Sequence, residues 1–224
     1  IEYKILKTFK YNLTEGQKRI LKELDGDIKS KNRMFRLIQG DVGSGKSILA
    51  FILAAKICDS KYQVAYMAPT EILSTQQFNQ AKKLFKLTNF KIENLTNKTK
   101  NKNEIINKIK TGNIDLIIGT HSLFQKKIKF KKLGLIIIDE QHKFGVRQRM
   151  ALAKKGGINC DVLLMSATPI PRTMMMSIYG DLDISRLLEK PLNRKKTMTL
   201  VKPEKKINEI IPLLKRQIEK DSQI

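Results

Sequence analysis

Gly40-Asp41-Val42-Gly43-Ser44-Gly45-Lys46-Ser47 is the stretch of this 224-residue sequence that decides the fold. It fits the phosphate-binding loop pattern G-x-x-x-x-G-K-[ST] at every specified position. An apolar run of strand length, 34–38, precedes the loop, and an apolar run of helix length, 48–57, follows it. Strand, glycine-rich loop and helix in this order are the context that the pattern requires. The sequence therefore predicts a nucleoside triphosphate site formed by all eight residues.

The residue types of this loop suit a chain of phosphates. Its glycines have no Cβ, so the backbone can adopt positive φ and approach an anion closely. The amide groups of the loop and of the following helix N-terminus then point at the phosphates. Lys46 offers a positive charge to the β- and γ-phosphates, and Ser47 offers a hydroxyl to Mg²⁺. A glycine-rich turn that carries Lys-Ser by chance is the alternative, and the flanking apolar runs argue against it.

Composition narrows the class of protein but not its partner. The net charge of +23 suggests a polyanion such as nucleic acid, yet most of the 44 basic residues are Lys, and a compositional bias toward Lys, Ile and Asn explains the charge equally well. No apolar run is long enough to span a membrane, and no secretory signal is present. The two Cys and two His have no metal-ligand spacing. We expect a cytoplasmic protein with buried, reduced thiols and no membrane partner.

The remaining pattern predicts an α/β fold. Further apolar runs of strand length lie at 63–68, 91–95, 115–119, 133–138 and 161–165, and helical patterns lie at 71–85 and 104–110. Strands that are apolar on both faces and alternate with helices form a parallel sheet covered by helices on both faces. Thr14 can cap a helix that ends near Leu24, and residues 1–13 show no clear periodicity.

The expected domain boundaries follow from the sequence after residue 180, which becomes charged and contains Pro191 and Asn193, as is typical of a linker. We expect a first domain at 1–183, a charged linker at 184–196, and the opening strand and helix of a truncated second domain at 197–224. Because the sequence does not begin with Met, we also expect it to be a segment of a longer protein.

Two carboxylates follow the apolar strand 133–138. In nucleotide-dependent motors the first, Asp139, helps to hold Mg²⁺, and the second, Glu140, activates the attacking water. Both must lie at the carboxyl end of a strand near the phosphate loop, where parallel sheets bind ligands. The alternative is that Asp139 and Glu140 are ordinary solvent-exposed acids at the end of a strand. The intact phosphate-binding loop upstream argues against this alternative.

Several ordered motifs then show a family resemblance. Asp139-Glu140-Gln141-His142 resembles the second motif of superfamily 2 helicases and translocases, and Ser166-Ala167-Thr168-Pro169 resembles their third motif. Leu13-Thr14 with Gln17 resembles their adenine-reading Q motif. The stretches 68–71 and 119–121 resemble their DNA-contacting motifs Ia and Ib. Within the superfamily, residues 40–46, 139–149, 167–173 and 179–183 are similar to the RecG family of bacterial branched-DNA helicases.

The resemblance covers about residues 13–201 and implies a RecA-like P-loop domain that uses ATP and Mg²⁺. Phosphate and Mg²⁺ would be bound by Lys46, Ser47 and Asp139, with Glu140 as the hydrolytic base and Gln17 reading adenine. The residues that would couple nucleotide state to DNA contact are Gln141, His142, Ser166 and Thr168. The residues that would lie near the DNA backbone are Pro69, Thr70, Thr120, His121 and, less clearly, Arg172.

The resemblance also implies what the intact protein does. It would be a monomer that hydrolyses ATP, moves on duplex DNA and remodels stalled forks and Holliday junctions in recombination and repair. It would need a wedge domain before Ile1 and an arginine finger from a second RecA-like domain, so we expect the 224-residue segment to bind nucleotide weakly and turn over little. Gly16 stands where the family usually has Ala, Ser47 where it has Thr, and Lys143 where it has Arg.

Three alternatives stay open. A translocase like the transcription-repair coupling factor is the nearest, although that family usually has Phe at position 44 and Glu at position 141, where this chain has Ser44 and Gln141. A small-molecule P-loop kinase would turn over nucleotide with metabolites and not with DNA. A non-catalytic DNA-binding module would bind DNA equally with and without nucleotide.

Overall fold

The computed structural model describes residues 1–125, 127–140, 160–168, 182–189, 201, 203 and 207–219. The chain divides into two compact units, Ile1–Pro191 and Leu192–Ile224. Within the described residues no helix has both the length and the apolar character needed to cross a bilayer.

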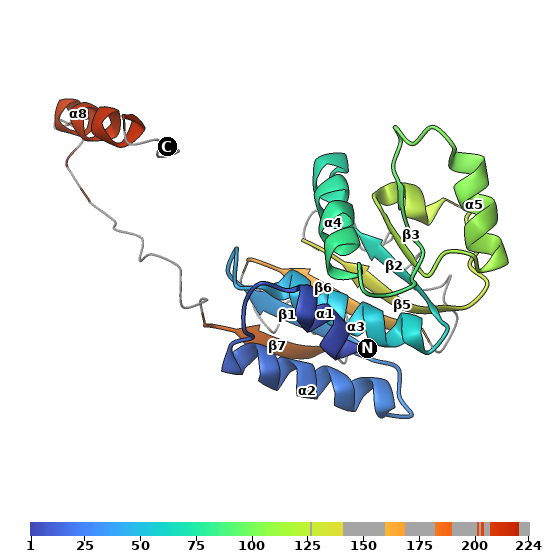
Figure 1. Ribbon diagram of the computed structural model, residues 1–224. Helices are drawn as coiled ribbons and strands as arrows, with labels where there is room; N and C mark the ends of the chain where they lie inside the picture. Colours follow the sequence, from blue (N-terminus) through green and yellow to red (C-terminus); the bar gives the residue numbers. More distant parts are fainter. Residues whose placement is uncertain are drawn as a thin grey trace. The chain divides into compact units, whose positions relative to one another are not determined.

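A seven-stranded sheet forms the centre of the first unit (Figure 1). Its strands are β1 (Phe35–Gly40), β2 (Gln63–Met67), β3 (Ile92–Leu95), β4 (Leu116–Gly119), β5 (Leu133–Ile138), β6 (Asp161–Ser166) and β7 (Asp183–Leu187). Their order across the sheet is β3-β4-β2-β5-β6-β1-β7. Each neighbouring pair is parallel. The predicted α/β fold with a parallel sheet is therefore confirmed.

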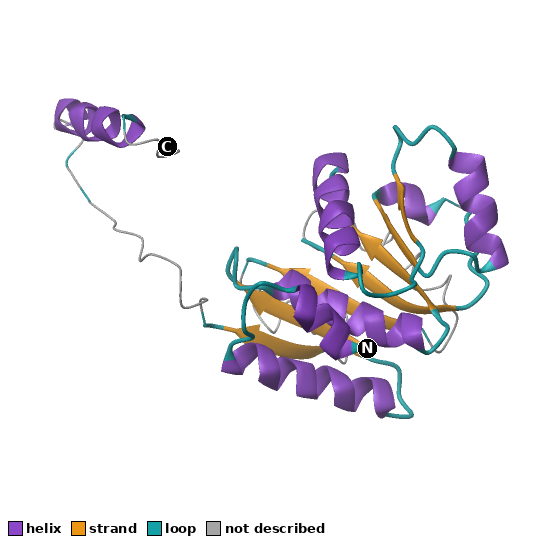
Figure 2. Cartoon of the chain, in the orientation of Figure 1, coloured by secondary structure: helices purple, strands orange, loops and turns teal. Residues whose placement is uncertain are grey.

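The helices connect the strands and cover the sheet (Figure 2). In the first unit they are α1 (Glu2–Thr8), α2 (Glu15–Lys29), α3 (Lys46–Asp59), α4 (Glu71–Leu84), α5 (Lys102–Thr111) and the 3₁₀ turn η1 (His121–Phe124). In the second unit α8 spans Ile207–Ile218, within the region where the sequence predicts a helix, and it contains Pro212. The predicted strand of this unit would precede α8, where only Val201 and Pro203 lie among the described residues.

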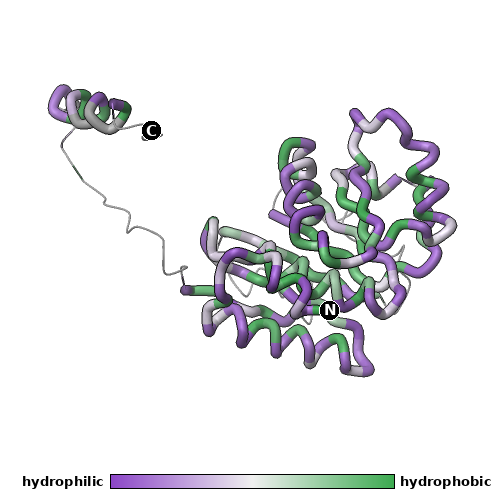
Figure 3. Tube along the Cα trace, in the orientation of Figure 1, coloured by the Kyte–Doolittle hydropathy of each residue, from purple (hydrophilic) through white to green (hydrophobic). Residues whose placement is uncertain are grey.

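Side chains of each strand alternate between two apolar cores. On β5, Leu135 and Ile137 join the core that includes residues of α1, α2, α3 and α4. Ile136 and Ile138 join the other core, which includes residues of α5 and η1. Figure 3 accordingly colours much of the central strands as hydrophobic. Helix α3 is buried along most of its length, which explains why its sequence is apolar on nearly every side.

Two thiols lie inside these cores, as predicted. Cys58 and Cys160 are both free and buried. Burial raises the pKa of Cys58 far above its ordinary value and raises the pKa of Cys160 to about 12. Neither thiol is therefore a thiolate at neutral pH, and neither has the character of a reactive cysteine.

Three local features differ from the sequence-based expectations. Residues 2–8, for which no periodicity was evident, form helix α1, whose Ile5 is completely buried. Helix α2 continues past Leu24 to Lys29. Residues 183–187, nearly all of which we assigned to the linker, form β7 and pair with β1 at the edge of the sheet.

A buried arginine explains both the longer helix and the added strand. Arg36 lies on β1 and donates from Nε and Nη2 to the Asp27 carboxylate of α2. Its Nη1 donates to Glu23 Oε2 at 3.2 Å and to Ser185 Oγ on β7 at 2.9 Å. Ser185 also donates to Glu23. One guanidinium therefore ties α2, β1 and β7 together, in the forked geometry that only Arg offers.

Replacing this arginine should destabilise the fold. In Arg36→Met the apolar stem remains but Asp27 and Glu23 lose their cation, so we expect the free energy of unfolding to fall by about 3 kcal/mol. Urea denaturation followed by far-UV circular dichroism measures this change. The matched control is Lys18→Met, because Lys18 pairs with Glu15 at 2.7 Å on the exposed side of α2; its effect should stay within about 0.5 kcal/mol. Equal losses in the two variants would contradict the role given to Arg36.

Candidate functional site

The glycine-rich loop connects the end of β1 to the start of α3. Two of its glycines have left-handed backbone angles, with φ of 76° at Gly43 and 91° at Gly45. A Cβ at Gly40 would lie 2.9 Å from the carbonyl oxygen of Leu187 on β7. The loop therefore needs glycine for its conformation at two positions and for close strand packing at a third.

Gln17 holds the start of α2 against this loop. Thr14 and Gln17 form a reciprocal capping box, in which the Thr14 hydroxyl accepts from the Gln17 amide and Gln17 Oε1 accepts from the Thr14 amide at 2.9 Å. The Gln17 Nε2 group donates to the carbonyl oxygen of Ser44 at 2.9 Å. A Cβ at Gly45 would lie 2.2 Å from this nitrogen. Gln17 is thus in contact with the loop, and its reading of adenine stays a prediction.

Gly16 contacts the residues that follow β7. Its amide donates to Glu189 Oε2 at 2.9 Å, and this hydrogen bond lowers the pKa of the Glu189 carboxyl. A Cβ at Gly16 would lie 3.1 Å from that oxygen. The position at which this chain has Gly in place of the usual Ala is therefore the one that contacts the Glu189 carboxylate. That carboxylate lies at the N-terminus of α2, where the helix dipole favours negative charge.

Lys46 is buried inside the loop. Its ammonium donates to the carbonyl oxygens of Gly40 at 2.6 Å and Asp41 at 3.1 Å, and the residue is 8% exposed. Burial lowers the pKa of Lys46, while the carboxylates of Glu140, Asp139 and Asp41 act in the opposite direction. The ammonium is therefore within electrostatic reach of both acids that follow β5.

The topology explains why these groups meet. Strands β1 and β5 both pair with β6 in the same direction, so their carboxyl ends lie at one rim of the sheet. The phosphate loop leaves that rim from β1, and Asp139 and Glu140 leave it from β5. Glu140 has a left-handed φ of 48°, which is uncommon for a residue with a side chain and is often found at functional sites.

Asp139 is 8% exposed and held by polar side chains. Its Oδ2 accepts from the Tyr66 hydroxyl at 3.1 Å and from Gln77 Nε2 at 3.5 Å. Its amide donates to the carbonyl oxygen of Met67 at 2.9 Å. Burial raises the pKa of the Asp139 carboxyl, although its hydrogen bond with Tyr66 acts against that rise.

The third-motif residues lie between the two acids and the loop. Ser166 ends β6, is completely buried, and accepts from the Thr168 amide at 3.2 Å. Gln39 on β1 donates to the Thr168 carbonyl oxygen at 3.1 Å. The other predicted coupling residues, Gln141 and His142, and the predicted DNA contact Arg172 lie outside the described residues.

The predicted DNA-contacting residues differ in exposure. Thr70 is exposed and caps α4 by accepting from the Leu73 amide at 3.2 Å, and Pro69 is half-buried. His121 is exposed at the start of η1. Thr120 is 1% exposed, and its hydroxyl has no hydrogen-bond partner among the residues that the structure describes. The Thr120 side chain is therefore not accessible to DNA in this conformation.

The residues at the rim suit Mg²⁺ bound together with phosphates. In the described ranges no group of three or more His, Cys, Asp and Glu side chains is arranged to hold a metal by itself. Mg²⁺ in nucleotide sites takes one or two carboxylates and completes its shell with phosphates and water. Asp139 and Ser47 fit this requirement, because Asp139 supplies one buried carboxylate at the rim and Ser47 supplies a hydroxyl next to the loop lysine.

Sequence reasoning missed Tyr66 and Gln77. A phenol within an otherwise apolar strand was the available signal, because a buried Tyr hydroxyl normally finds a partner. No comparable signal marked Gln77, which is one of several polar residues of α4.

Comparison with known proteins finds a matching family model, DEAD/DEAH box helicase, over residues 14–177. ATP-dependent DNA helicase RecG of Thermotoga maritima is 40% identical over 220 residues, which are 97% of this chain and 28% of that protein. RecG of Streptococcus pneumoniae serotype 4 is 44% identical over 216 residues, 96% of this chain and 32% of that protein. The chain therefore spans about a third of the length of these relatives or less. The predicted resemblance to RecG is confirmed.

Solved structures agree on the fold. A structure of RecG bound to a three-way DNA junction superposes with a TM-score of 0.84 at 37% identity, over 96% of this chain and 29% of that chain. S. cerevisiae Dbp5 superposes with a TM-score of 0.64 over 83% of this chain and 52% of that chain, at 18% identity, which shows the fold alone. The expected RecA-like helicase fold is confirmed by these neighbours.

The buried Asp139 carboxyl should make stability depend on pH. Because its pKa is raised in the folded protein, the native state holds this proton more tightly than the unfolded chain, and stability falls as the pH rises from the unfolded pKa through the folded one. Asp139→Asn removes the charge and keeps an acceptor for Tyr66. We expect the variant to unfold at a higher urea concentration at pH 7, with a gain that shrinks toward pH 4. An equal gain at both pH values would contradict this.

Proposed function

Because the chain belongs to the DEAD/DEAH box helicase family, we propose that it is the first RecA-like motor domain of an ATP-dependent DNA helicase of the RecG type. The observation that carries the proposal is that the buried Lys46, in the loop after β1, and Asp139 and Glu140, after β5, lie at the same rim of a parallel sheet. That arrangement suits a triphosphate, whose transfer depends on positioning and charge neutralisation more than on covalent chemistry.

Each group then has a distinct task. The loop amides and the start of α3 bind the phosphates, and Lys46 exchanges the carbonyl oxygens of Gly40 and Asp41 for phosphate oxygens. Asp139 and Ser47 would hold Mg²⁺, which would supply positive charge against the phosphates when bound. Glu140, which is half-buried and follows Asp139, would accept a proton from the attacking water.

The proposed partner of the whole protein is branched or forked DNA. One relative has been solved on a three-way DNA junction, which supports this choice. Stalled forks and Holliday junctions are then the proposed substrates, and the intact protein would act as a cytoplasmic monomer in recombination and repair. In this proposal, residues 197–224 open a second RecA-like domain, which supplies the arginine finger, and a wedge domain reads the junction.

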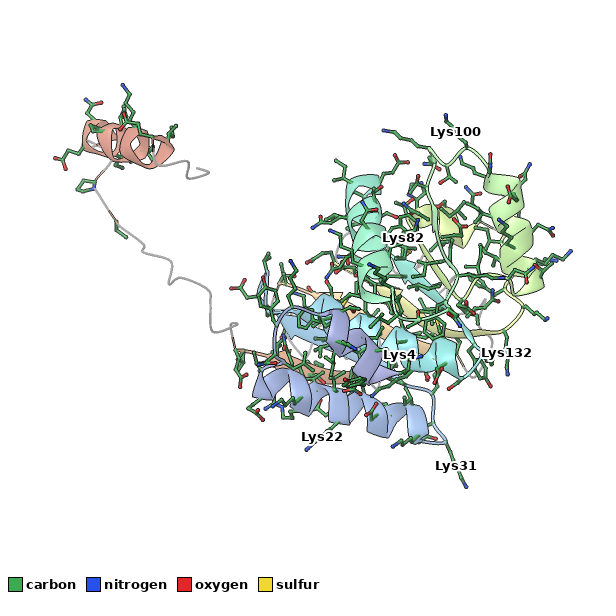
Figure 4. All side chains as sticks on the ribbon, in the orientation of Figure 1. Lys4, Lys22, Lys31, Lys82, Lys100 and Lys132 are labelled. Atoms are coloured by element: carbon green, nitrogen blue, oxygen red, sulfur yellow. The ribbon has the colours of Figure 1, made fainter. Side chains whose placement is uncertain are left out.

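Thr70 and His121 are the proposed DNA contacts of this domain. Thr70 lies at the N-terminus of α4, a position that attracts phosphate. The lysines labelled in Figure 4 lie on α1, α2, α4 and several loops of the first unit. We assign the DNA contact to the exposed motif residues, because the net charge alone does not indicate a DNA-binding patch.

Removing the Lys46 ammonium should weaken nucleotide binding. A hydrogen bond to a charged group contributes about 1.5–3 kcal/mol, so Lys46→Ala should reduce ATP affinity by about 10- to 100-fold in the presence of Mg²⁺. Equilibrium binding of a fluorescent ATP analogue measures this. The control is Lys18→Ala, whose ammonium pairs with Glu15 on the surface, and its affinity should match the wild type.

A steady-state ATPase assay with and without forked DNA tests the proposed domain requirement. We expect the 224-residue chain to show little turnover in either condition, because no arginine finger is supplied. Fork-stimulated turnover that Lys46→Ala abolishes would contradict the need for a second domain. Unchanged ATP binding in Lys46→Ala would contradict the site itself.

A further inference from the structure

A buried hydroxyl holds the carboxylate that we assign to Mg²⁺. Tyr66 lies on β2, next to β5, and is completely buried. Its hydroxyl donates to Asp139 Oδ2 at 3.1 Å. Asp139 follows β5, so the neighbouring strand β2 supplies a hydrogen-bond donor to this carboxylate.

Packing leaves the Tyr66 hydroxyl little freedom. Its ring stacks on Phe51 of α3, with centroids 5.4 Å apart and planes inclined by 15°. Phe51 in turn contacts Phe85 edge-on, with ring centroids 6.0 Å apart. A ring enclosed by these aromatic contacts keeps one rotamer, and the position of its hydroxyl is set by the core and not by solvent.

Gln77 provides a second donor to the same carboxylate oxygen. It lies on α4, is 7% exposed, and its Nε2 is 3.5 Å from Asp139 Oδ2. Its Oε1 is buried and has no hydrogen-bond partner in the part of the chain that the structure describes. Leaving Oε1 unpaired costs about 1–3 kcal/mol, and the hydrogen bond to Asp139 is the contact that Gln77 makes through its other polar atom.

Metal ligands are commonly oriented by outer groups of this kind. A ligating carboxylate that is itself hydrogen-bonded keeps its orientation, and loss of the outer partner typically costs about 10- to 100-fold in metal affinity. A buried carboxylate with two donors on one oxygen has a defined direction before any ligand arrives.

We propose that Tyr66, assisted by Gln77, is a positioning residue for Mg²⁺, which orients the Asp139 carboxylate before nucleotide binds. The inference rests on the proposed nucleotide site and adds residues outside the helicase motifs described above. Tyr66 does not contact the reacting atoms. Its effect should therefore appear in the dependence on Mg²⁺ and not in the phosphate contacts made by the loop.

Tyr66→Phe tests this by removing one oxygen and keeping the stacked ring. Binding of a fluorescent ADP analogue is measured over a range of Mg²⁺ concentrations and again in EDTA. We expect the Mg²⁺ concentration at half-maximal enhancement of binding to rise about tenfold or more, while affinity in EDTA stays at the wild-type value. Tyr62→Phe is the control, because Tyr62 is 39% exposed and contacts Lys132 through its ring face; it should match the wild type in both conditions.

Gln77→Met gives an independent test on a different element. It removes the weaker donor to Asp139, so the Mg²⁺ requirement should rise by less than in Tyr66→Phe, again with unchanged binding in EDTA. It also decides the question if Tyr66→Phe does not fold, as judged by far-UV circular dichroism.

The outcomes separate the inference from the proposed function. Equal loss of affinity in Mg²⁺ and in EDTA would mean that Tyr66 acts only as core structure, and wild-type behaviour in both variants would likewise overturn the proposal. If the wild-type protein itself binds the analogue without any response to Mg²⁺, the proposed function fails first.

Discussion

A buried ammonium among carbonyl oxygens and two nearby carboxylates is the interaction on which this structure depends. Lys46 is 8% exposed and is stabilised by Gly40, Asp41 and the acids that follow β5. An unpaired buried cation would be costly, so the loop must present its carbonyl oxygens and the acids must lie close by. The glycines of the loop and the parallel direction of the strands both serve this requirement.

The sheet order places the necessary groups side by side. Strand β6 lies between β1 and β5 and ends in Ser166, which contacts Thr168, while Gln39 of β1 holds the Thr168 carbonyl oxygen. On the other side of β5, β2 contributes Tyr66 and leads to α4 with Gln77 and Thr70. The residues proposed to bind nucleotide, metal and DNA therefore lie on neighbouring elements at one rim of the sheet. A shift of one element can be transmitted to the next through these contacts.

Much of this arrangement could be predicted from the sequence, for identifiable reasons. Apolar runs of strand length marked the central strands, because those strands are buried on both faces. The loop was recognisable because phosphate binding demands particular residue types at fixed spacing.

Helix α1 was missed because it is short and anchored by one core residue, Ile5. Strand β7 was missed because an edge strand with Asp183 and Arg186 exposed resembles a linker, and the arginine that retains it lies far away in sequence, at position 36. Tyr66 could not be assigned because its role appears only when β2, β5 and α3 are brought together.

The position of β7 has a mechanical consequence. The first unit's sheet ends with this strand, which pairs with β1 over five residues up to Gly40, where the nucleotide loop begins. A pulling force that enters the domain through the chain after Glu189 would act first on β7 and on its backbone hydrogen bonds with β1. Such a force would arrive on the strand beside the nucleotide loop and, through the Gly16 amide and Arg36, on helix α2. Tension and nucleotide occupancy would thus act on the same few residues.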